Sequence, residues 1–352
     1  MSKSINLALV GASGVVGSKI ISIFEKKNIA INNFYPLGSS SVGNKIIFNG
    51  RKYQIEELAT FDSSLADVAI FSAGSKVAKQ YAESFVDKGT YVIDLSSEFR
   101  YKDEVPLVIP EINGNILSEL NGPTLIANPN CSVSQLLVAL EPIHRNFKVD
   151  ILNIATYQAV SGTGKEAVEE LTNQIKYDKS DVNVYTKQIK HDKSDVNVYP
   201  KQIAFNVIPQ CDIFLENDFT KEEMKVAWET KKILDPSIEV QATCVRVPVI
   251  NGHSEAVFFR TEKKASKLEI LKLLESSVGI KVLDNPALFE YPTPLENAND
   301  TEDVYVGRVR CQSIKDENWI SMWIVADNVY GKGAALNTVQ ILQNLIENNK
   351  LC

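Results

Sequence analysis

Residues 5–24 read INLALVGASGVVGSKIISIF, and this stretch indicates the fold class of the chain. Ile5–Val10 is a compact apolar run of strand length, and Gly17–Phe24 has the pattern of a helix. The glycines between them permit a tight turn and let the backbone approach a pyrophosphate at the helix N-terminus. Their spacing is G-x-x-G-x-x-G rather than G-x-G-x-x-G, so the position directly after a strand is what favours dinucleotide binding.

The alternation of strand and helix continues through the first 130 residues. Asp67–Phe71 is a second clear strand that ends at Ser72-Ala73-Gly74, and Val77–Val86 has the pattern of a helix. Tyr91–Leu95 is another strand. Such alternation is typical of a parallel sheet with helices on both faces. We therefore predict an α/β fold that begins with a Rossmann-type doubly wound parallel sheet.

The rest of the chain has longer strands and fewer helices. Its apolar strands are Ile151–Ala155, Val240–Val249, Ala256–Phe259, Tyr305–Val309 and Ile320–Val325. They favour a second, α+β domain with a mixed sheet, one face of which is available to a partner subunit. The last helix, Ala334–Ile346, is amphipathic, and we expect it to pack on the first domain. The predicted domains are residues 1–130 with 331–352 for the dinucleotide, and 131–330 for catalysis and dimerisation.

Composition excludes several classes of protein. The chain has 352 residues, 44% hydrophobic and 23% charged, with a net charge of −7, which argues against nucleic acid or an anionic membrane as partner. No apolar run is long enough for a transmembrane helix, and the N-terminus lacks a signal peptide. The five cysteines are scattered and form no C-x-x-C pair, which excludes a disulfide framework and a structural zinc site. We expect a cytoplasmic protein without a bound metal.

One of these cysteines lies in a distinctive context, Asn128-Pro129-Asn130-Cys131-Ser132. The residues after it, up to Ile143, predict a buried helix of about three turns. Pro129 interrupts regular structure, and Asn130 and Ser132 are good capping residues. A thiol at the start of that helix would feel the positive end of its dipole, which favours the thiolate. The alternative is a cysteine that only fills space in the core.

Histidine is the residue that would activate such a thiol, and the chain has three. His144 ends the helix after Cys131, where we expect it to satisfy the last carbonyls as a cation. His191 lies in a duplicated segment whose other copy has Tyr177 at the same position. His253 follows a glycine-containing turn in a stretch that also contains Arg246, so it is the candidate general base. The alternative for His253 is an ordinary surface histidine.

A thiolate beside a nicotinamide predicts one class of reaction. The thiol adds to an aldehyde, hydride leaves for the cofactor, and the thioester is cleaved by a nucleophile. Gln158 could hold the carbonyl oxygen, and the loop Ser161–Gly164 could contact the cofactor or a phosphate. For the cofactor, the segment Leu37–Lys45 has no carboxylate to repel a 2′-phosphate and offers Ser39, Ser40, Ser41 and Lys45 to bind one. We therefore expect NADP.

The segment Lys176–Ile189 is repeated by Lys190–Ile203, with 12 of 14 positions identical. A single duplication is not a solenoid, which needs at least three copies. Added loop length in a surface segment costs little free energy. We expect this insertion to be functionally silent.

Eight motifs in order resemble the aspartate-semialdehyde dehydrogenase family over nearly the whole chain. They are GASGVVG, DLSSEFR, NPNCS, ATYQAVSGTGKEAVEEL, YPKQIAFNVIPQ, TKEEMK with ETKKIL, ATCVRVPVINGHSE and ADNVYGKGAALN. The resemblance implies NADPH-dependent reductive dephosphorylation of L-aspartyl 4-phosphate to L-aspartate 4-semialdehyde through a cysteine thioester. It also implies a cytoplasmic homodimer that serves lysine, diaminopimelate, threonine, methionine and isoleucine biosynthesis.

The resemblance also assigns roles to single residues. It implies that Cys131 is the acylated nucleophile, His253 the acid/base catalyst and Gln158 a catalytic residue. Arg246 would bind the substrate carboxylate, Glu222 its amine, and Arg100 with Asn130 the phosphate, with Lys225 on the same helix face as Glu222. An E-x-x-K pair is also common on solvated helices, so the resemblance carries this last assignment. The implied cofactor-binding residues are Gly11, Ser13, Gly14, Val15, Val16, Ser40, Ser41, Gly74, Ser161, Gly162 and Asn328.

Two departures from the family pattern affect what the resemblance implies. Many members have an arginine that grips the 2′-phosphate where this chain has Ser39-Ser40-Ser41, which weakens the case for strict NADP preference. The duplicated segment lengthens a region that lies near the subunit interface in the family. Two alternatives remain: N-acetyl-glutamyl-phosphate reductase, whose substrate has no free amine for Glu222, and a non-catalytic dinucleotide-sensing protein, which would not need Cys131 and His253.

Overall fold

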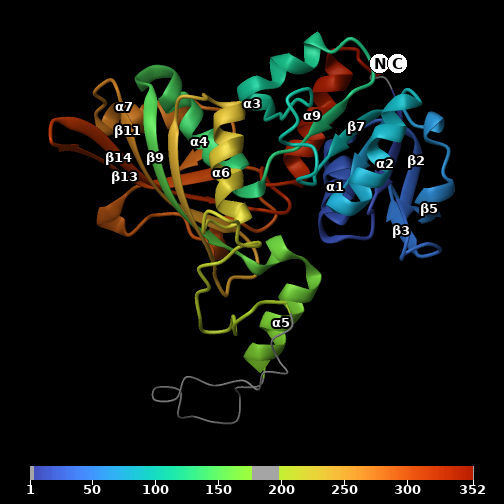
Figure 1. Cartoon of the computed structure of the whole chain (residues 1–352), viewed down its shortest axis with the longest axis horizontal. Coiled ribbons are helices and arrows are strands. Elements are labelled where there is room, and N and C mark those ends of the chain that lie inside the picture. The colour runs from blue at the N-terminus through green and yellow to red at the C-terminus, as the bar shows by residue number, and fades with distance from the viewer. Residues whose placement is uncertain (1–3, 177–197, 352) are drawn as a thin grey trace.

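The computed structural model of the protein describes residues 4–176 and 198–351. Two six-stranded sheets form two lobes, and both chain ends lie at the lobe that the first sheet forms (Figure 1). Most of the duplicated segment lies outside the described residues. Its last residues, from Val198 onward, lie against helix α5 (Lys165–Lys176), where Tyr199 and Ile203 join a small apolar cluster with Leu171.

The first sheet is entirely parallel, with strand order β5-β2-β1-β6-β7-β8. Its strands are β1 (Ile5–Val10), β2 (Ile31–Gly38), β5 (Glu56–Glu57), β6 (Val68–Phe71), β7 (Tyr91–Asp94) and β8 (Leu125–Ala127). Helices α1 (Val15–Lys27) and α2 (Ser75–Asp87) connect strands of this sheet, and a hairpin of β3 (Lys45–Phe48) and β4 (Arg51–Gln54) follows β2. This order is that of a dinucleotide-binding sheet, and it confirms the predicted Rossmann-type fold.

The turn between β1 and α1 depends on one glycine in particular. A Cβ atom on Gly17 would lie 2.3 Å from the carbonyl oxygen of Gly11, so no side chain fits there. The first turn of α1 therefore crosses close above the end of β1. This brings the N-terminus of α1 to the carboxyl edge of the sheet, where ligands of doubly wound folds bind.

The second sheet is mixed, as predicted, with strand order β10-β9-β11-β14-β13-β12. Its strands are β9 (Val149–Gln158), β10 (Glu239–Arg246), β11 (His253–Thr261), β12 (Ile280–Val282), β13 (Val304–Ile314) and β14 (Glu317–Ala326). Helices α4 (Cys131–Phe147), α6 (Lys221–Ile233) and α7 (Lys267–Ser276) lie against it, and α4 contacts four of its strands. The remaining helices are α3 (Pro110–Asn113), α8 (Pro294–Asn297) and α9 (Ala335–Glu347), with short 3-10 helices at Leu58–Thr60, Ser63–Leu65, Gly114–Glu119, Val160–Thr163 and Pro286–Leu288.

Helix α4 is longer than the three turns expected from its apolar run. It spans 17 residues and includes Pro142. The prediction ended the helix at His144, directly after the apolar residue Ile143, but Phe147 one turn later also packs against the core. Burial of that side chain favours a further turn of helix.

The chain crosses between the two sheets twice. The first connection, residues 128–130, joins β8 to α4, and the second, residues 327–334, joins β14 to α9. Helix α9 then packs against α1, with Val339 and Leu342 in one apolar cluster with Ile20 and Phe24. The Asn128 side chain accepts a hydrogen bond from Asn337 Nδ2 at 2.8 Å, which ties the first connection to the start of α9.

Candidate active site

A cavity of about 430 Å³ lies between the two sheets, beside both connections. The first sheet contributes residues that follow its strands, such as Val16 and Leu95, and the second contributes Arg246 at the end of β10. The other lining residues are Ser97, Arg100, Asn128, Pro129, Asn130, Cys131, Gln158, Ser161, Gly162, Thr163, Asp212, Glu222, Lys225, Asn328, Val329, Gly333 and Ala334. The cavity therefore brings together many of the residues proposed from sequence.

Cys131 is the first residue of α4 and is half-buried in this cavity. Asn130 caps the helix, because its side-chain oxygen accepts a hydrogen bond from the Ser132 N–H at 2.9 Å. Ser132 itself lies within the helix and is fully buried, so only Asn130 has the predicted capping role.

His253, the first residue of β11, places its Nε2 atom 3.3 Å from the sulfur of Cys131. Its other ring nitrogen, Nδ1, accepts a hydrogen bond from the backbone N–H of Ala159 at 3.0 Å. A neutral imidazole that accepts at Nδ1 carries its proton on Nε2. Burial, followed by the nearby charge of Arg246, lowers the pKa of His253 to about 3, so the ring is neutral near pH 7. His253 is fully buried, and the alternative of a surface histidine is wrong.

The expected thiolate at Cys131 is not favoured in this arrangement. Burial raises the pKa of the Cys131 thiol to about 12, and the charge of Glu222 adds to the shift. Arg246 and Arg100 act in the opposite direction but do not offset it. The sequence-based expectation considered the dipole of the helix alone, whereas tertiary burial beside a carboxylate disfavours the anion.

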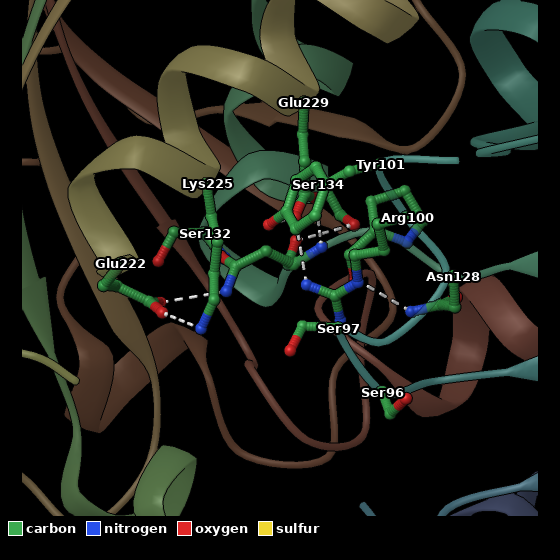
Figure 2. A network of polar contacts seen from close by, with 12 residues as sticks. Ser96, Ser97, Arg100, Tyr101, Asn128, Ser132, Ser134, Glu222, Lys225 and Glu229 are labelled. Carbon is green, nitrogen blue, oxygen red and sulfur yellow. Dashed lines mark hydrogen bonds and ion pairs between the residues drawn. The ribbon is translucent and has the colours of Figure 1, made fainter. Parts of the chain in front are cut away.

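Glu222 and Lys225 lie on one face of α6 and both point into the cavity (Figure 2). The Lys225 ammonium is 2.9 Å from Glu222 Oε2 and 2.7 Å from Asp212 Oδ2. Burial alone would raise the pKa of Glu222, but Lys225 and a hydrogen bond from Asn130 hold it down, at about 2. The alternative of a solvated helix pair is wrong, since both side chains are buried. A buried carboxylate and ammonium side by side suit a zwitterionic ligand.

Arg246 faces the same space from the end of β10. Its Nη1 donates to the carbonyl oxygen of Ala159 at 2.7 Å. Its Nε is buried and has no hydrogen-bond partner within residues 4–176 and 198–351. A buried guanidinium with an unused donor is suited to a carboxylate ligand, which can accept two parallel hydrogen bonds.

Gln158, at the end of β9, donates from Nε2 to Ser132 Oγ at 3.0 Å and to Glu222 Oε1 at 3.1 Å. Its amide therefore lies between the helix that carries Cys131 and the acidic side chain of α6. Gly162 lies in the loop that follows. A Cβ atom at this position would be 3.1 Å from His253 Cε1 and 3.3 Å from Arg246 Nη1, so the loop closes tightly over both side chains.

Asn328 and Ser161 connect the second chain crossing to that loop. Asn328 Oδ1 accepts a hydrogen bond from the backbone N–H of Gly252 at 2.9 Å. Asn328 Nδ2 donates a hydrogen bond to Ser161 Oγ at 3.0 Å. Both residues line the cavity. They occupy the side where the carboxyl edge of the first sheet meets the second.

The other predicted cofactor residues lie along the carboxyl edge of the first sheet. Gly14 is the N-cap of α1 and offers no side-chain acceptor to the first-turn N–H groups, which suits an anionic ligand. Gly74 caps α2 in the same way. Ser40 and Ser41 follow β2. Of this group only Val16 lines the cavity; Gly11, Ser13, Gly14, Val15, Ser40, Ser41 and Gly74 do not.

Glu229, a fully buried carboxylate on α6, was not predicted from the sequence. It accepts from Arg100 Nη1 at 3.1 Å and from the backbone N–H of Asn130 at 2.6 Å. Its spacing of seven residues from Glu222 on one helix was the only available signal.

His144 also departs from its expected role. Its Nδ1 atom accepts a hydrogen bond from the backbone N–H of Val149 at 3.2 Å, and burial lowers the pKa of the ring. The neutral ring therefore acts as an acceptor rather than as a cation for the last carbonyls.

Among residues 4–176 and 198–351 there is no cluster of metal-ligating side chains. Within the same ranges no helix is long and apolar enough to cross a membrane.

A parallel dinucleotide-type sheet, joined to a cavity lined by a cysteine that contacts a buried histidine, defines a dehydrogenase that acts through a thiol. Comparison with known families agrees. Residues 6–120 match the NAD binding domain of semialdehyde dehydrogenase, and residues 140–330 match its dimerisation domain. The chain belongs to the aspartate-semialdehyde dehydrogenase family.

Individual relatives carry that assignment. The aspartate-semialdehyde dehydrogenase of Shewanella violacea is 44% identical, over 98% of this chain and 99% of its own length. The crystal structure of aspartate semialdehyde dehydrogenase II of Vibrio cholerae complexed with ASA is 40% identical and has a TM-score of 0.90, covering 98% of this chain and 99% of the other. The Candida albicans enzyme with NADP has a TM-score of 0.74 at 23% identity over 99% of this chain and 100% of its own, and shows a shared fold alone.

Proposed function

We propose that the protein converts L-aspartyl 4-phosphate to L-aspartate 4-semialdehyde with NADPH and releases phosphate. This places it in the biosynthesis of lysine, diaminopimelate, threonine, methionine and isoleucine. The observation that carries the proposal is the 3.3 Å approach of Cys131 Sγ to His253 Nε2. Cys131 lines a cavity that also holds a guanidinium, Arg246, and a carboxylate–ammonium pair, Glu222 and Lys225, while His253 is fully buried beside the sulfur.

Each charged group of the substrate has a complementary partner in the proposed complex. Arg246 binds the α-carboxylate, and Glu222 binds the ammonium group in place of its present partner Lys225. Arg100 and Asn130, with Lys225, bind the phosphate. N-acetyl-glutamyl phosphate has no ammonium group, so Glu222 would keep Lys225 as its partner and would gain no contact with the ligand. The arrangement therefore supports the aspartyl substrate over that alternative.

The chemistry follows from the thiol and the protonated Nε2 atom. The sulfur of Cys131 attacks the acyl carbon, the bond to the phosphate oxygen breaks, and the thiol proton leaves with the phosphate. The N-terminus of α1 and the carboxyl edge of the first sheet would hold NADPH, which when bound would supply a hydride to the thioester carbon. His253 donates its Nε2–H hydrogen bond to the resulting oxyanion. Collapse of that oxyanion breaks the C–S bond, releases the aldehyde and leaves a sulfur that solvent reprotonates.

The cofactor residues of the proposal are those at the edge of the first sheet and in the adjoining loops. The N-terminus of α1 at Gly14–Val16 would bind the pyrophosphate, and Ser40 and Ser41 the 2′-phosphate. Gly74, Ser161, Gly162 and Asn328 would lie along the ribose and nicotinamide, with Gly11 and Ser13 in the turn. The unfilled helix cap at Gly14 supports this placement.

We also propose the remaining organisation of the protein. Residues 1–130 with 331–352 form the dinucleotide-binding domain, and residues 131–330 form the catalytic domain. The family description of residues 140–330 as a dimerisation domain supports a homodimer built through the second sheet. The scattered, unpaired cysteines support a cytoplasmic location.

The decisive experiment is an assay of the purified protein in the reverse direction. Aspartate semialdehyde, NADP⁺ and inorganic phosphate should give phosphate-dependent formation of NADPH, followed by absorbance. The acylated form of Cys131 should be detected by mass spectrometry when phosphate is omitted. A signal only with N-acetyl-glutamate semialdehyde would assign the protein to the alternative substrate. Absence of any signal with both substrates would contradict a dehydrogenase function.

A further inference from the structure

A single carboxylate, Glu229, connects the loop after β7 to the start of the cysteine-bearing helix. Figure 2 shows it on α6, directed toward Arg100 and Tyr101. Its Oε1 atom accepts from Arg100 Nη1 at 3.1 Å and from Tyr101 OH at 3.3 Å. Its Oε2 atom accepts from the backbone N–H of Asn130 at 2.6 Å. The two oxygens therefore hold two different segments of chain.

Glu229 does not line the cavity, and it is fully buried. Arg100 and Asn130 both line it, and Asn130 directly precedes Cys131. Asn130 also donates from its side chain to Glu222 Oε1 at 2.9 Å and caps α4. The position of the guanidinium relative to the start of α4 is therefore fixed by a group that the ligand does not touch.

A second residue of α6, Lys232, holds the backbone of the same loop. Its ammonium donates to the carbonyl oxygens of Arg100 at 2.9 Å, Lys102 at 2.7 Å and Val105 at 2.9 Å. Three carbonyl acceptors use all three donors of an ammonium group. Glu229 thus holds the side chain of Arg100, and Lys232 holds its main chain.

Both residues extend the stripe of α6 that enters the cavity. Glu222, Lys225, Glu229 and Lys232 are spaced by three, four and three residues, which places them along one face of the helix. The first two point into the cavity, and the last two hold the loop that carries Arg100. One rigid helix therefore sets the positions of both ends of the polar site.

We propose that Glu229 and Lys232 are positioning residues for phosphate, acting through Arg100 and Asn130. The inference rests on the proposed function, which assigns phosphate to those two groups. Glu229 fixes the distance between the phosphate-binding guanidinium and the segment that carries Cys131, while Lys232 fixes the loop from behind. Neither residue touches the carboxylate or amine of the substrate.

The test compares Glu229→Gln and Lys232→Met with the parent in the phosphate-dependent reverse reaction. Glutamine keeps the shape of Glu229 but turns an N–H toward Arg100 or Asn130, so one of the two segments loses its acceptor. Loss of one charge-assisted hydrogen bond predicts a KM for phosphate about 10- to 100-fold higher. The KM for aspartate semialdehyde should change less than about threefold, since Arg246 and Glu222 are untouched. Lys232→Met should raise the KM for phosphate to a smaller extent.

The matched control is Lys231→Met, which removes an adjacent lysine; within residues 4–176 and 198–351 its ammonium pairs only with Glu239, at 3.6 Å. Its kinetics should equal those of the parent. A merely structural role for Glu229 predicts equal effects on both KM values together with a lower Tm, and this result would overturn the inference. An unchanged KM for phosphate in a folded Glu229→Gln would overturn it too. If Glu229→Gln does not fold, Lys232→Met takes its place. A rise in its KM for phosphate that exceeds the rise in its KM for aspartate semialdehyde supports the inference, and an unchanged KM for phosphate overturns it.

Titration calorimetry with inorganic phosphate separates this inference from the proposed function. The parent, Glu229→Gln, Lys232→Met and Lys231→Met are each titrated without substrate. If the parent binds phosphate but does not turn over aspartate semialdehyde, the proposed function fails, and weaker binding by the two variants still supports the positioning role. Equal phosphate affinity in all four proteins overturns the positioning role whatever the activity. A parent that neither binds nor uses phosphate overturns both.

Discussion

The backbone N–H of Ala159 donates to Nδ1 of His253 at 3.0 Å, and this one hydrogen bond determines the tautomer of the ring. With Nδ1 occupied as an acceptor, the proton of the neutral imidazole is on Nε2, which faces the sulfur of Cys131. His253 is therefore a hydrogen-bond donor to the sulfur and to an oxyanion formed beside it. It is not an acceptor for the thiol proton in this arrangement.

This tautomer leads to a prediction for substitutions at His253. An asparagine side chain can donate a hydrogen bond but cannot transfer a proton, so His253→Asn should retain more activity than His253→Ala. We expect His253→Ala to lose about 10²- to 10³-fold in kcat, the usual effect of removing one hydrogen-bond donor to an oxyanion. Cys131→Ser should lose nearly all turnover, because a neutral hydroxyl is a far weaker nucleophile. Steady-state kinetics measure all three variants, and an equal loss of kcat in the two histidine variants would indicate obligatory proton transfer.

Trapping of the covalent intermediate tests the nucleophile separately. A covalent adduct trapped on Cys211, Cys244 or Cys311 would contradict the assignment of Cys131.

The pKa of Cys131 predicts how the free enzyme reacts with iodoacetamide. Burial and Glu222 raise this pKa to about 12, so the thiol is protonated at neutral pH and ionises only as the pH rises. The alkylation rate should therefore increase about tenfold per pH unit between pH 7 and pH 10, in proportion to the thiolate. Glu222→Gln removes a negative charge near the sulfur and should accelerate alkylation at each pH. Mass spectrometry identifies the alkylated residue, and a plateau below pH 8 would indicate a thiolate favoured by the helix dipole.

Arg246→Lys should raise the KM for aspartate semialdehyde and also lower kcat. The guanidinium already uses Nη1 on the Ala159 carbonyl oxygen, and its planar shape leaves a second edge for a carboxylate. A lysine cannot make both contacts with fixed geometry. Kinetics with aspartate semialdehyde and with an analogue that lacks the carboxylate test this role. Unchanged kinetics would mean that Arg246 only closes the loop at Ala159.

The segment after β2 predicts a modest preference for NADPH. It has Ser39, Ser40 and Ser41 but no arginine to pair with a 2′-phosphate. A charge-assisted hydrogen bond contributes roughly 1.5–3 kcal/mol, or about 10- to 150-fold in affinity. Ser41→Arg should therefore increase the ratio of kcat/KM for NADPH over NADH within that range. A parent that already discriminates by more than about a thousandfold, with no gain in the variant, would place the 2′-phosphate on another group.

Local patterns predicted several elements well because each depends on its own residues, although the strand predicted at Val240–Val249 ends earlier, at Arg246. Ile5–Val10 is a strand with the predicted bounds, since its apolar run and the following glycine both act within a few residues. The distance between Cys131 and His253 was beyond such patterns, as it depends on how α4 and β11 pack. Glu229 had no local feature to distinguish it from Glu222 or Glu223. Its burial arises only when the loop at Arg100 folds against α6.

The expected thiolate failed for the same physical reason. A helix N-terminus is a local feature, and it favours an anion. Desolvation and the Glu222 carboxylate are tertiary effects, and they raise the pKa of the Cys131 thiol. The sequence motifs therefore indicated which residues belong to the site, but not the charge that each of them carries once it is buried.

The two chain crossings at residues 128–130 and 327–334 also limit how this molecule can move. Asn128 in the first crossing is bonded to Asn337, which lies in α9 just after the second crossing. Glu229 and Lys232 of α6 hold the loop at Arg100, which follows a strand of the first sheet. These bonds resist rotation of one sheet relative to the other. Cys131 follows the first crossing directly, and Asn328 belongs to the second, so the reacting sulfur lies where the two lobes are held together.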